Sequence, residues 1–423
     1  MPNRQSLASV FSVTSNTSCA ALVGIMLFVV LVVAPLAQAQ TFQVIYNFSG
    51  TTDGANPLAG VTVDNGGNLY CTTSMGGTVN RGTVCRLTHN GSEWTLKSLY
   101  SFAGPPDASV PIAPVVIGPD GSLYGTTEFG GENCGGNAGC GTVYRLQPPV
   151  GACKTVLCPW LETIVYKFTG GSDGANPGYG DVVFDAAGNL YGTTYFGGNN
   201  AQGVVFKLTH SGGSWTESAI HTFEGPDGIN PFSGVTFDSA GNLYGTTNLG
   251  GANNSGTVYE LLSPNWTEST LYSFQASTSG GTPYGGVIFD SAGNLYGGTS
   301  SGGTGNGGTV FELTPSGGSW SFDLLYNLTG TSYQPGVYSN LVRDASGNLY
   351  GTTKYDGANG AGSVFKLTPS GGDWVYSSLH DFTGGTDGAN PIGAPIFDAN
   401  GNLFGTAKNG GAHGDGVVWE ITP

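Results

Sequence analysis

The stretch Asp238-Ser239-Ala240-Gly241-Asn242-Leu243-Tyr244-Gly245-Thr246-Thr247 decides the fold, because close copies of it recur along the whole chain. Seven copies of its Gly-Asn-Leu-Tyr segment, some with one residue changed, begin at Gly67, Gly121, Gly188, Gly241, Gly293, Gly347 and Gly401. Successive copies start 52 to 67 residues apart, a period typical of propellers and other stacked arrays. The sequence is therefore that of a repeat protein.

Each repeat contains four short segments with the character of β-strands. In the third repeat these segments are residues 180–185, 188–194, 203–208 and 215–223. Apolar residues alternate at Val204, Phe206 and Leu208, and the intervening Asp-Ala-Ala-Gly and Ser-Gly-Gly-Ser segments favour tight turns. Four antiparallel strands in each of seven repeats predict an all-β fold, a seven-bladed β-propeller.

The two ends of the chain predict how the ring closes. The last repeat ends at residues 419–423 without a fourth strand, whereas residues 42–48 match the fourth strands at 96–102 and 271–274. The N-terminal strand should therefore complete the last blade, an arrangement that an open solenoid would not need. We expect one propeller over residues 40–423, with blades at about 49–102, 103–168, 169–223, 224–274, 275–328, 329–382 and 383–423 plus 41–48.

Residues 1–39 have the features of a secretory signal peptide. An apolar run at 20–33 is followed by Ala37-Gln38-Ala39, which fits cleavage after Ala39. An uncleaved signal anchor is the alternative. With the signal cleaved, no membrane span is expected, and the protein should be exported to the medium, the cell surface or the periplasm.

The amino-acid composition limits the classes of binding partner. The chain has 12 Lys and Arg against 28 Asp and Glu, a formal net charge of −16, which repels nucleic acid. Its 74 glycines accompany 11% aromatic residues, so the glycine serves ordered turns rather than disorder. We expect a monomer whose partner is a polysaccharide or a protein.

Strand pairing in the hairpin of strands two and three predicts a disulfide. Pairing Leu190 with Leu208 sets Gly192 opposite Phe206, so an aromatic ring covers a strand glycine. The same register sets Gly245 against Tyr259, Gly297 against Phe311, Gly351 against Phe365 and Gly405 against Trp419. In the first repeat this pair of positions is Cys71 and Cys85, which an oxidising compartment would join.

The second repeat carries two insertions, each with two cysteines. Cys134 and Cys140 lie in the first insertion and Cys153 and Cys158 in the second. Consecutive hairpin loops of a blade lie on opposite faces, so we predict the local pairs Cys134–Cys140 and Cys153–Cys158. Metal binding by these thiols is the alternative.

The connections between blades carry the most polar recurring motif, Asp-Gly-x-Asn-Pro. Its candidate ligand-binding residues are Asp53, Asn56, Asp173, Asn176, Asp227, Asn230, Asp387 and Asn390. These residues are also turn formers, so a structural role competes with binding of a glycan or of calcium through their oxygens. We expect no cofactor and no dedicated metal site, with calcium as the one candidate ion.

Two other recurring residues are expected to be structural. The Asp at positions 64, 185, 238, 290, 344 and 398 should accept backbone amides in an Asx-type turn. The Trp at positions 94, 160, 215, 266, 320 and 374 should pack between outer strands, with sugar stacking as the alternative. No nucleophile elbow, phosphate loop or metal-spaced His pair is present, so no catalytic residue is predicted.

With the repeat laid out, best seen at residues 347–372, the chain resembles the bacterial GloVer (Gloeobacter/Verrucomicrobia) tandem repeat family from residue 41 to 423. The resemblance implies an exported repeat protein, often of the kind that ends in one of several surface-sorting signals. This chain stops at Ile421-Thr422-Pro423 without such a tail, so release to the periplasm or medium is expected. The family implies no activity and no catalytic residues.

Two functional hypotheses of different classes follow. The first is a secreted or cell-surface scaffold that binds carbohydrate or protein without catalysis. The second is a secreted glycosidase or lyase that uses carboxylates at the mouth of the propeller, for which two facing carboxylates about 5 to 10 Å apart would be needed. A mainly structural surface-layer protein is a third, weaker hypothesis.

Overall fold

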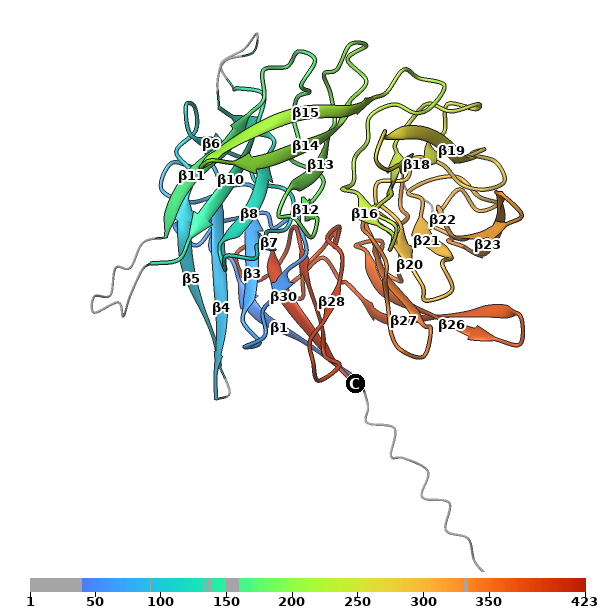
Figure 1. The fold of residues 1–423 in the computed structure, drawn as a ribbon. Helices are drawn as coiled ribbons and strands as arrows, with labels where there is room; N and C mark the ends of the chain where they lie inside the picture. Colours follow the sequence, from blue (N-terminus) through green and yellow to red (C-terminus); the bar gives the residue numbers. More distant parts are fainter. Residues whose placement is uncertain (1–39, 92, 132–133, 135–137, 150–159, 331–333) are drawn as a thin grey trace, which may run out of the picture. The chain divides into compact units, whose positions relative to one another are not determined.

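The computed structural model describes residues 40–91, 93–131, 134, 138–149, 160–330 and 334–423. All the helix or strand elements in these residues are strands, and they lie in one compact unit, Gln40–Pro423. Seven four-stranded antiparallel sheets, the blades, succeed one another along the chain (Figure 1). The predicted all-β, seven-bladed propeller is confirmed.

The blades are numbered in chain order. Blade 1 contains β2 (Thr62–Val63), β3 (Leu69–Thr73), β4 (Thr83–Asn90) and β5 (Glu93–Ser101); blade 2 contains β7 (Val116–Ile117), β8 (Leu123–Thr127), β10 (Thr142–Gln147) and β11 (Leu161–Lys167); blade 3 contains β12 (Val183–Phe184), β13 (Leu190–Thr194), β14 (Val204–Ser211) and β15 (Ser214–Thr222). Blade 4 contains β16 (Thr236–Phe237), β17 (Leu243–Thr247), β18 (Thr257–Leu262) and β19 (Thr267–Ser273); blade 5 contains β20 (Ile288–Phe289), β21 (Leu295–Gly298), β22 (Thr309–Ser316) and β23 (Ser319–Asn327). Blade 6 contains β24 (Val342–Arg343), β25 (Leu349–Thr353), β26 (Ser363–Ser370) and β27 (Asp373–Asp381). The short β6 (Ala108–Ser109) and β9 (Phe129–Gly130) pair with each other beside blade 2.

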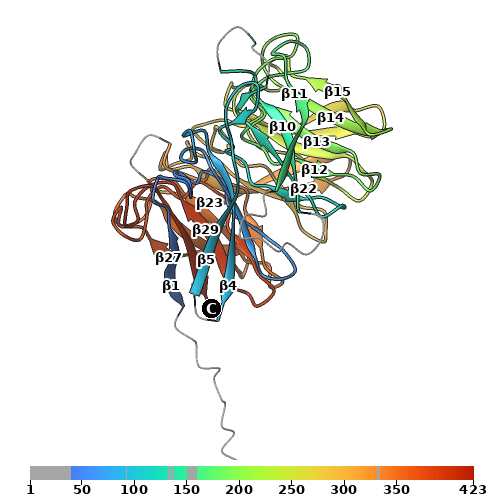
Figure 2. The ribbon, with the colours of Figure 1, turned by 90° about the vertical axis from the view of Figure 1, so that its left-hand side faces the viewer.

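Blade 7 is closed by the two ends of the propeller. It contains β28 (Ile396–Phe397), β29 (Leu403–Ala407), β30 (Val417–Thr422) and, as its fourth strand, β1 (Thr41–Asn47). β1 pairs antiparallel with β30, and the two strands lie side by side in Figure 1; Figure 2 shows β1, in blue, beside the red C-terminal strands. The predicted closure by the N-terminal strand is confirmed.

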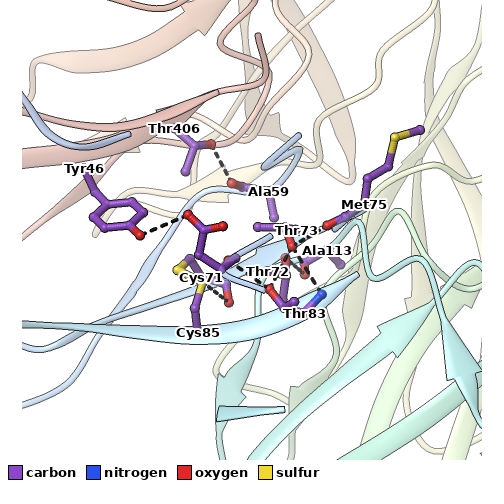
Figure 3. The surroundings of a disulfide bond; sticks show 11 residues. Tyr46, Ala59, Cys71, Thr72, Thr73, Met75, Thr83, Cys85, Ala113 and Thr406 are labelled. Carbon is purple, nitrogen blue, oxygen red and sulfur yellow. Dashed lines mark hydrogen bonds between the residues drawn. A yellow bond between two sulfur atoms is a disulfide. The ribbon is translucent and has the colours of Figure 1, made fainter. Parts of the chain in front are cut away.

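The predicted register of the second and third strands is also confirmed. Gly245 lies opposite Tyr259, and a Cβ on Gly245 would lie 2.4 Å from the hydroxyl oxygen of the buried Tyr259. Glycine is therefore required at position 245, because the Tyr259 side chain fills the space that any other side chain would need. In blade 1 the same pair is Cys71 and Cys85, which form a disulfide with their Cα atoms 5.1 Å apart (Figure 3).

The recurring Asp forms the expected Asx-type turn. The Asp238 carboxylate accepts the backbone N–H groups of Ala240 (2.8 Å) and Asn242 (2.9 Å), the Asn242 side-chain amide and the Tyr244 hydroxyl. Blade 2 has Gly118 at this position, and Asp120 takes over the role by accepting from Ser122 and Tyr124. The motif that decides the fold thus closes the turn before each second strand.

Apolar packing lies between neighbouring blades. One cluster joins Phe223 of blade 3 to Val235, Leu243 and Tyr259 of blade 4. The recurring Trp is a packing residue, but the predicted location between outer strands is wrong. Its ring contacts the second-strand aromatic residue of the preceding blade. Trp266, for example, lies 5.6 Å from Tyr191 between ring centroids. An apolar cluster lies at each of the seven junctions, so each blade packs against two others.

Candidate functional site

The four predicted Asp residues of the connections lie at four different blade junctions and accept local hydrogen bonds. Asp173 accepts the backbone N–H of Thr169 (2.8 Å), its hydroxyl (2.6 Å) and the hydroxyl of Tyr166 (3.2 Å). Asp53 has the same partners in Ser49 and Tyr46. Burial acts to raise the pKa of Asp53, but these hydrogen bonds hold it below its ordinary value. At Asp227 and Asp387 a histidine replaces the tyrosine, with His221 at 2.9 Å and His380 at 3.0 Å.

The four predicted Asn residues tie neighbouring blades together. Each has a positive φ between 52° and 56°, a conformation that Asn tolerates better than most residues. Each side-chain amide donates to the backbone carbonyl of the residue that follows the second strand of the preceding blade: Asn56 to Lys408, Asn176 to Glu128, Asn230 to Tyr195 and Asn390 to Lys354. Ligand binding by these Asp and Asn residues stays a prediction. The described residues contain no group of three or more His, Cys, Asp or Glu that could hold a metal ion.

A cavity of about 890 Å³ lies on the axis of the propeller, since residues from all seven blades line it. Its wall comes from the inner strands and from the segments that lead into them, for example residues 58–63 of blade 1 and 392–396 of blade 7. Each such segment begins just after the proline of a connection, which follows Asn in four of the seven connections. The connections therefore deliver the chain to one end of the cavity, which we call the mouth.

Two positions of each repeat, which we call the mouth positions, are joined at this end of the blade, and both vary between repeats. The first opens the inward segment and lines the cavity in all seven blades; it is Leu58, Ile112, Tyr179, Phe232, Tyr284, Tyr338 and Ile392. The second is the residue after Gly-Thr-Thr or its equivalent, namely Ser74, Glu128, Tyr195, Asn248, Ser300, Lys354 and Lys408, of which Tyr195, Lys354 and Lys408 line the cavity. Backbone hydrogen bonds join the second position to the inward connection, as from the Tyr195 N–H to the Asn176 carbonyl. The blade body hardly changes around the ring, whereas its mouth does.

Blades 3 to 6 build an arc of aromatic rings at the mouth, which we call the aromatic arc: Tyr179, Tyr195, Phe232, Tyr284 and Tyr338. The ring centroids of Tyr179 and Phe232 are 4.0 Å apart, those of Phe232 and Tyr284 are 4.5 Å apart, and Tyr284 stacks on Tyr338 at 4.4 Å. All five rings are partly exposed and line the cavity. The other three blades present Leu58, Ile112 and Ile392 instead.

The hydroxyl groups of the aromatic arc meet polar partners at the mouth. The Tyr179 hydroxyl donates to the Glu128 carboxylate at 3.0 Å. Burial raises the pKa of both Glu128 and Tyr179, and the Glu128 charge raises that of Tyr179 further. On the other side Gln334 accepts the hydroxyls of Tyr284 (3.4 Å) and Tyr338 (3.2 Å). The rings are therefore held in place by both stacking and hydrogen bonds.

Two lysines continue the mouth beyond the aromatic arc. Lys354 and Lys408 line the cavity from blades 6 and 7. The Lys354 ammonium lies 4.5 Å from the centroid of the Tyr338 ring and 5.0 Å from that of Tyr355, within the range of a cation–π interaction. Burial first, and then the nearby charge of Lys408, lower the pKa of Lys354.

Deeper in the cavity, one wall position carries polar residues in two blades. It is Gly60, Pro114, Asp181, Gly234, Gly286, Asn340 and Ala394 in blades 1 to 7. Burial raises the pKa of Asp181, and the Asn340 side-chain oxygen accepts the Gly286 N–H at 2.6 Å. Among the described residues that line the cavity, Asp181 is the one carboxylate.

Threonines of the second strands fix the backbone around the mouth. In six blades a second-strand threonine donates to a carbonyl of the next blade's inward segment, as Thr72 does to Ala113 (2.9 Å) and Thr406 to Ala59 (2.6 Å; Figure 3). Blade 5 has Gly298 there, where a Cβ would lie 2.6 Å from the Cβ of Val337. Packing replaces the hydrogen bond at that junction. The hydrogen-bonded and packed junctions between blades thus form a rigid scaffold for the mouth, as is common for binding sites on loops.

The remaining disulfide predictions concern the cysteines of blade 2. Cys134 and Cys140 form the predicted disulfide, with their Cα atoms 5.7 Å apart. Cys153 and Cys158, like the predicted signal peptide of residues 1–39, lie outside the described residues. No helix among the described residues could cross a membrane.

The sequence interpretation placed the candidate site on the repeated Asp and Asn, and it missed the aromatic arc and the two lysines. A usable signal was present, since the residue after Gly-Thr-Thr or its equivalent takes five identities in seven repeats while its neighbours recur. Four of the arc residues follow a connection proline by one to three positions instead. The alignment of repeats could not show that these two positions converge on the axis.

Comparisons with known proteins place the chain in a family. The Gloeobacter/Verrucomicrobia repeat matches residues 32–236, 134–337 and 262–423, so the chain belongs to the Gloeobacter/Verrucomicrobia repeat family. The resemblance found in the sequence is confirmed. No curated protein matches the chain in sequence.

Solved structures share the fold at low sequence identity. The extracellular domain of a one-component system from B. thetaiotaomicron has a TM-score of 0.53 and 11% identity over 90% of this chain and 40% of that one. A polysaccharide lyase, an ulvan lyase bound to -[GlcA(1-4)Rha3S]-, has a TM-score of 0.51 and 11% identity over 88% of this chain and 94% of the lyase. A second structure of an ulvan lyase of this polysaccharide lyase family has a TM-score of 0.51 and 12% identity over 87% of this chain and 93% of that one. At these identities the likeness shows the fold alone.

Proposed function

We propose that this member of the Gloeobacter/Verrucomicrobia repeat family is an exported protein that binds a carbohydrate at the mouth of its propeller. The observation that carries the proposal is the aromatic arc of blades 3 to 6. A pyranose ring has apolar C–H faces and a rim of hydroxyl groups. It therefore suits a surface that offers partly exposed aromatic faces beside polar atoms.

The polar groups of the mouth match the rim of a sugar. Glu128 and Gln334 accept hydrogen bonds from tyrosines at the two ends of the aromatic arc and keep further acceptor capacity for sugar hydroxyls. Phe196, next to Tyr195, is 48% exposed and extends the apolar surface outward, with the two ring centroids 4.4 Å apart. An extended chain of sugars could thus run from the mouth onto the face of blade 3.

The fold and the disulfides support the setting. Structures of this fold include an extracellular domain and a lyase that was solved with a polysaccharide fragment. The Cys71–Cys85 and Cys134–Cys140 disulfides fit an oxidising compartment outside the cytoplasm. Both observations agree with the export that the N-terminal sequence predicts.

Binding is better supported than hydrolysis. A glycosidase with the usual two carboxylates needs them to face each other across the substrate. The described lining of the cavity offers Asp181 alone, and the Glu128 carboxylate at the mouth accepts the Tyr179 hydroxyl at 3.0 Å. The aromatic arc and the fixed backbone around it can bind a sugar without any catalytic group. We therefore propose a binding protein, with enzymatic cleavage as the outcome that the following experiment would reveal.

The test compares two Tyr→Ala variants of the secreted chain on a panel of plant and algal polysaccharides. Tyr284→Ala removes the centre of the aromatic arc, whereas Tyr272→Ala removes a tyrosine that stacks on Phe322 at the outer edge of the ring. Tyr284→Ala should weaken binding about tenfold or more, as removal of a central aromatic side chain does, and Tyr272→Ala should leave it unchanged. Equal binding by both variants, or release of shorter sugars by the wild type, would contradict the proposal.

A further inference from the structure

The second mouth position carries a positive charge in two neighbouring blades only. Lys354 and Lys408 occupy it in blades 6 and 7, whereas the other five blades have neutral residues or Glu128 there. The whole chain contains only 12 Lys and Arg, so two lysines at one mouth are a marked local concentration. Like charges placed side by side repel each other, and nothing in the blade requires them, because five blades fold without a lysine at this position.

Among the described residues, neither mouth lysine is in an ion pair: the ion pairs there involve Arg145, His221 and His380. Lys354 is half-buried between the rings of Tyr338 and Tyr355. Burial and the charge of Lys408 lower its pKa, and an anion that approached the ammonium group would stabilise its charged form.

The backbones of both lysines are fixed from two sides. The Lys354 carbonyl accepts the Asn390 side chain at 3.0 Å, and its N–H donates to the Gly336 carbonyl at 3.2 Å. The Lys408 carbonyl accepts the Asn56 side chain at 3.2 Å, and its N–H donates to the Asn390 carbonyl. The repeated Asn of the connections therefore fixes the backbone of both lysines beside the cavity before any ligand arrives, which lowers the cost of binding.

We infer that the carbohydrate bound at the mouth is anionic, a glycan bearing carboxylate or sulfate groups, and that Lys354 and Lys408 together bind one such group next to the aromatic arc. This inference rests on the proposed function. Because Tyr284 covers one face of the Tyr338 ring and Lys354 lies over that ring, we expect the sugar to pack against the exposed side of the aromatic arc. A substituent at its edge then comes close to Lys354 and to Lys408, which lines the same cavity. A sulfate or carboxylate there exchanges the repulsion between the lysines for two charge-assisted hydrogen bonds.

The net charge of the chain makes the pair selective. At −16 the protein repels polyanions in general, and salt screens that repulsion beyond about 8 Å at physiological ionic strength. An anion is therefore favoured only where the two lysines lie close to it and an aromatic surface holds the sugar. The protein should discriminate an anionic glycan from acidic polymers that lack sugar rings.

The experiment measures affinity by isothermal calorimetry for a polyuronate, a sulfated glycan and their neutral counterparts. The variants are Lys354→Gln/Lys408→Gln, Tyr284→Ala and the control Lys366→Gln. Lys366 lies on β26, away from the mouth, and its ammonium group is 5.5 Å from the centroid of the Tyr350 ring. The double lysine variant should bind the anionic glycans about tenfold more weakly or worse, because removing a partly buried charge-assisted hydrogen bond has at least that effect. It should bind the neutral ones unchanged, and Lys366→Gln should behave as wild type.

The outcomes separate the two proposals. Equal wild-type affinity for neutral and anionic glycans, unaffected by the lysine change but abolished in Tyr284→Ala, would overturn the anionic inference and leave carbohydrate binding intact. Lysine-dependent binding of polyglutamate as tight as that of the glycans would instead overturn carbohydrate binding and leave an anion site. The polyuronate and sulfated arms identify which anionic group the lysines accept, and binding to none of these probes would overturn both proposals.

Discussion

The body of each blade and the mouth of the propeller obey opposite rules. In the body the same packing recurs around the ring. An aromatic residue covers a second-strand glycine in six blades. An Asp closes the turn before the second strand, either at the repeated position, as Asp238 does, or two residues later, as Asp120 does in blade 2. At the mouth the same backbone positions carry leucine, phenylalanine, tyrosine, glutamate or lysine. Packing restricts which residues the blade body can have. The mouth positions are not restricted in this way, so their residues can be selected for binding a ligand.

This difference between body and mouth predicts that substitutions in the blade body change the free energy of unfolding but not glycan affinity. The largest effect is expected at the Cys71–Cys85 disulfide. The Cys71→Ser/Cys85→Ser variant should lose about 3 kcal/mol, because it opens a loop with a sequence separation of 14 and buries two hydroxyl groups. The Cys71→Gly/Cys85→Phe variant installs the pair that other blades use, and it should recover about half of that loss by filling the same space. Urea unfolding of both variants measures the difference.

Glycan affinity serves as the control for these two variants, since neither cysteine lies at the mouth. It should equal that of the wild type wherever the variant is folded. If the Gly and Phe pair were no more stable than the two serines, blade 1 would not be equivalent to the others, and the rule for blade bodies would be broken.

The sequence predicted the body far better than the mouth. Turn, register, closure and both described disulfides depend on interactions between segments that are neighbours in the chain or occupy equal places in each repeat, as with Gly245 and Tyr259. The mouth depends on convergence: Tyr179 and Tyr338 are far apart in sequence, and only the closed ring brings them to one cavity. The repeated Asn drew attention because it recurs, yet its visible contact is with the backbone of Lys354 and its equivalents.

A second prediction sharpens the comparison at a position that varies although it lies far from the mouth. Glu217 on β15 has no hydrogen-bond partner for one carboxylate oxygen, and burial, followed by the charge of Asp173, raises its pKa to about 7. The equivalent residues of other blades are Leu96, Glu162, Glu268, Phe322, Tyr376 and Phe42. Variation here reflects alternative ways to pack blades together rather than a ligand.

Because the folded protein raises this pKa, it favours the protonated form. That contribution to stability is fully present below the ordinary glutamate pKa and is lost as the pH rises through about 7. Glu217→Gln should therefore match the wild type at acidic pH and exceed its stability at pH 8 by roughly 1 kcal/mol, a value reduced for solvent screening. Thermal unfolding at both pH values measures this, with the exposed Glu93→Gln as the control. A stability gain that did not depend on pH, or a change in glycan affinity, would contradict this interpretation.

The smallest expected effect tests the mouth itself. Ile392 of blade 7 occupies the position that carries Tyr338 in blade 6, so Ile392→Tyr would extend the aromatic arc by one ring toward Lys408. One added aromatic ring contributes about 0.5 to 1.5 kcal/mol, and glycan binding should tighten by roughly three- to tenfold. Stability should change by less than about 0.5 kcal/mol, because the side chain is partly exposed.

Ile392→Val is the matched control, since it alters the same position without adding a ring. If the tyrosine destabilised the propeller as strongly as loss of the disulfide, Ile392 would be a packing residue of the blade body. The mouth would then follow the rule of the body in blades 7, 1 and 2, and the ligand site would be confined to the four blades that already carry aromatic rings. If affinity rises while stability holds, the mouth is a surface on which each blade can be changed independently.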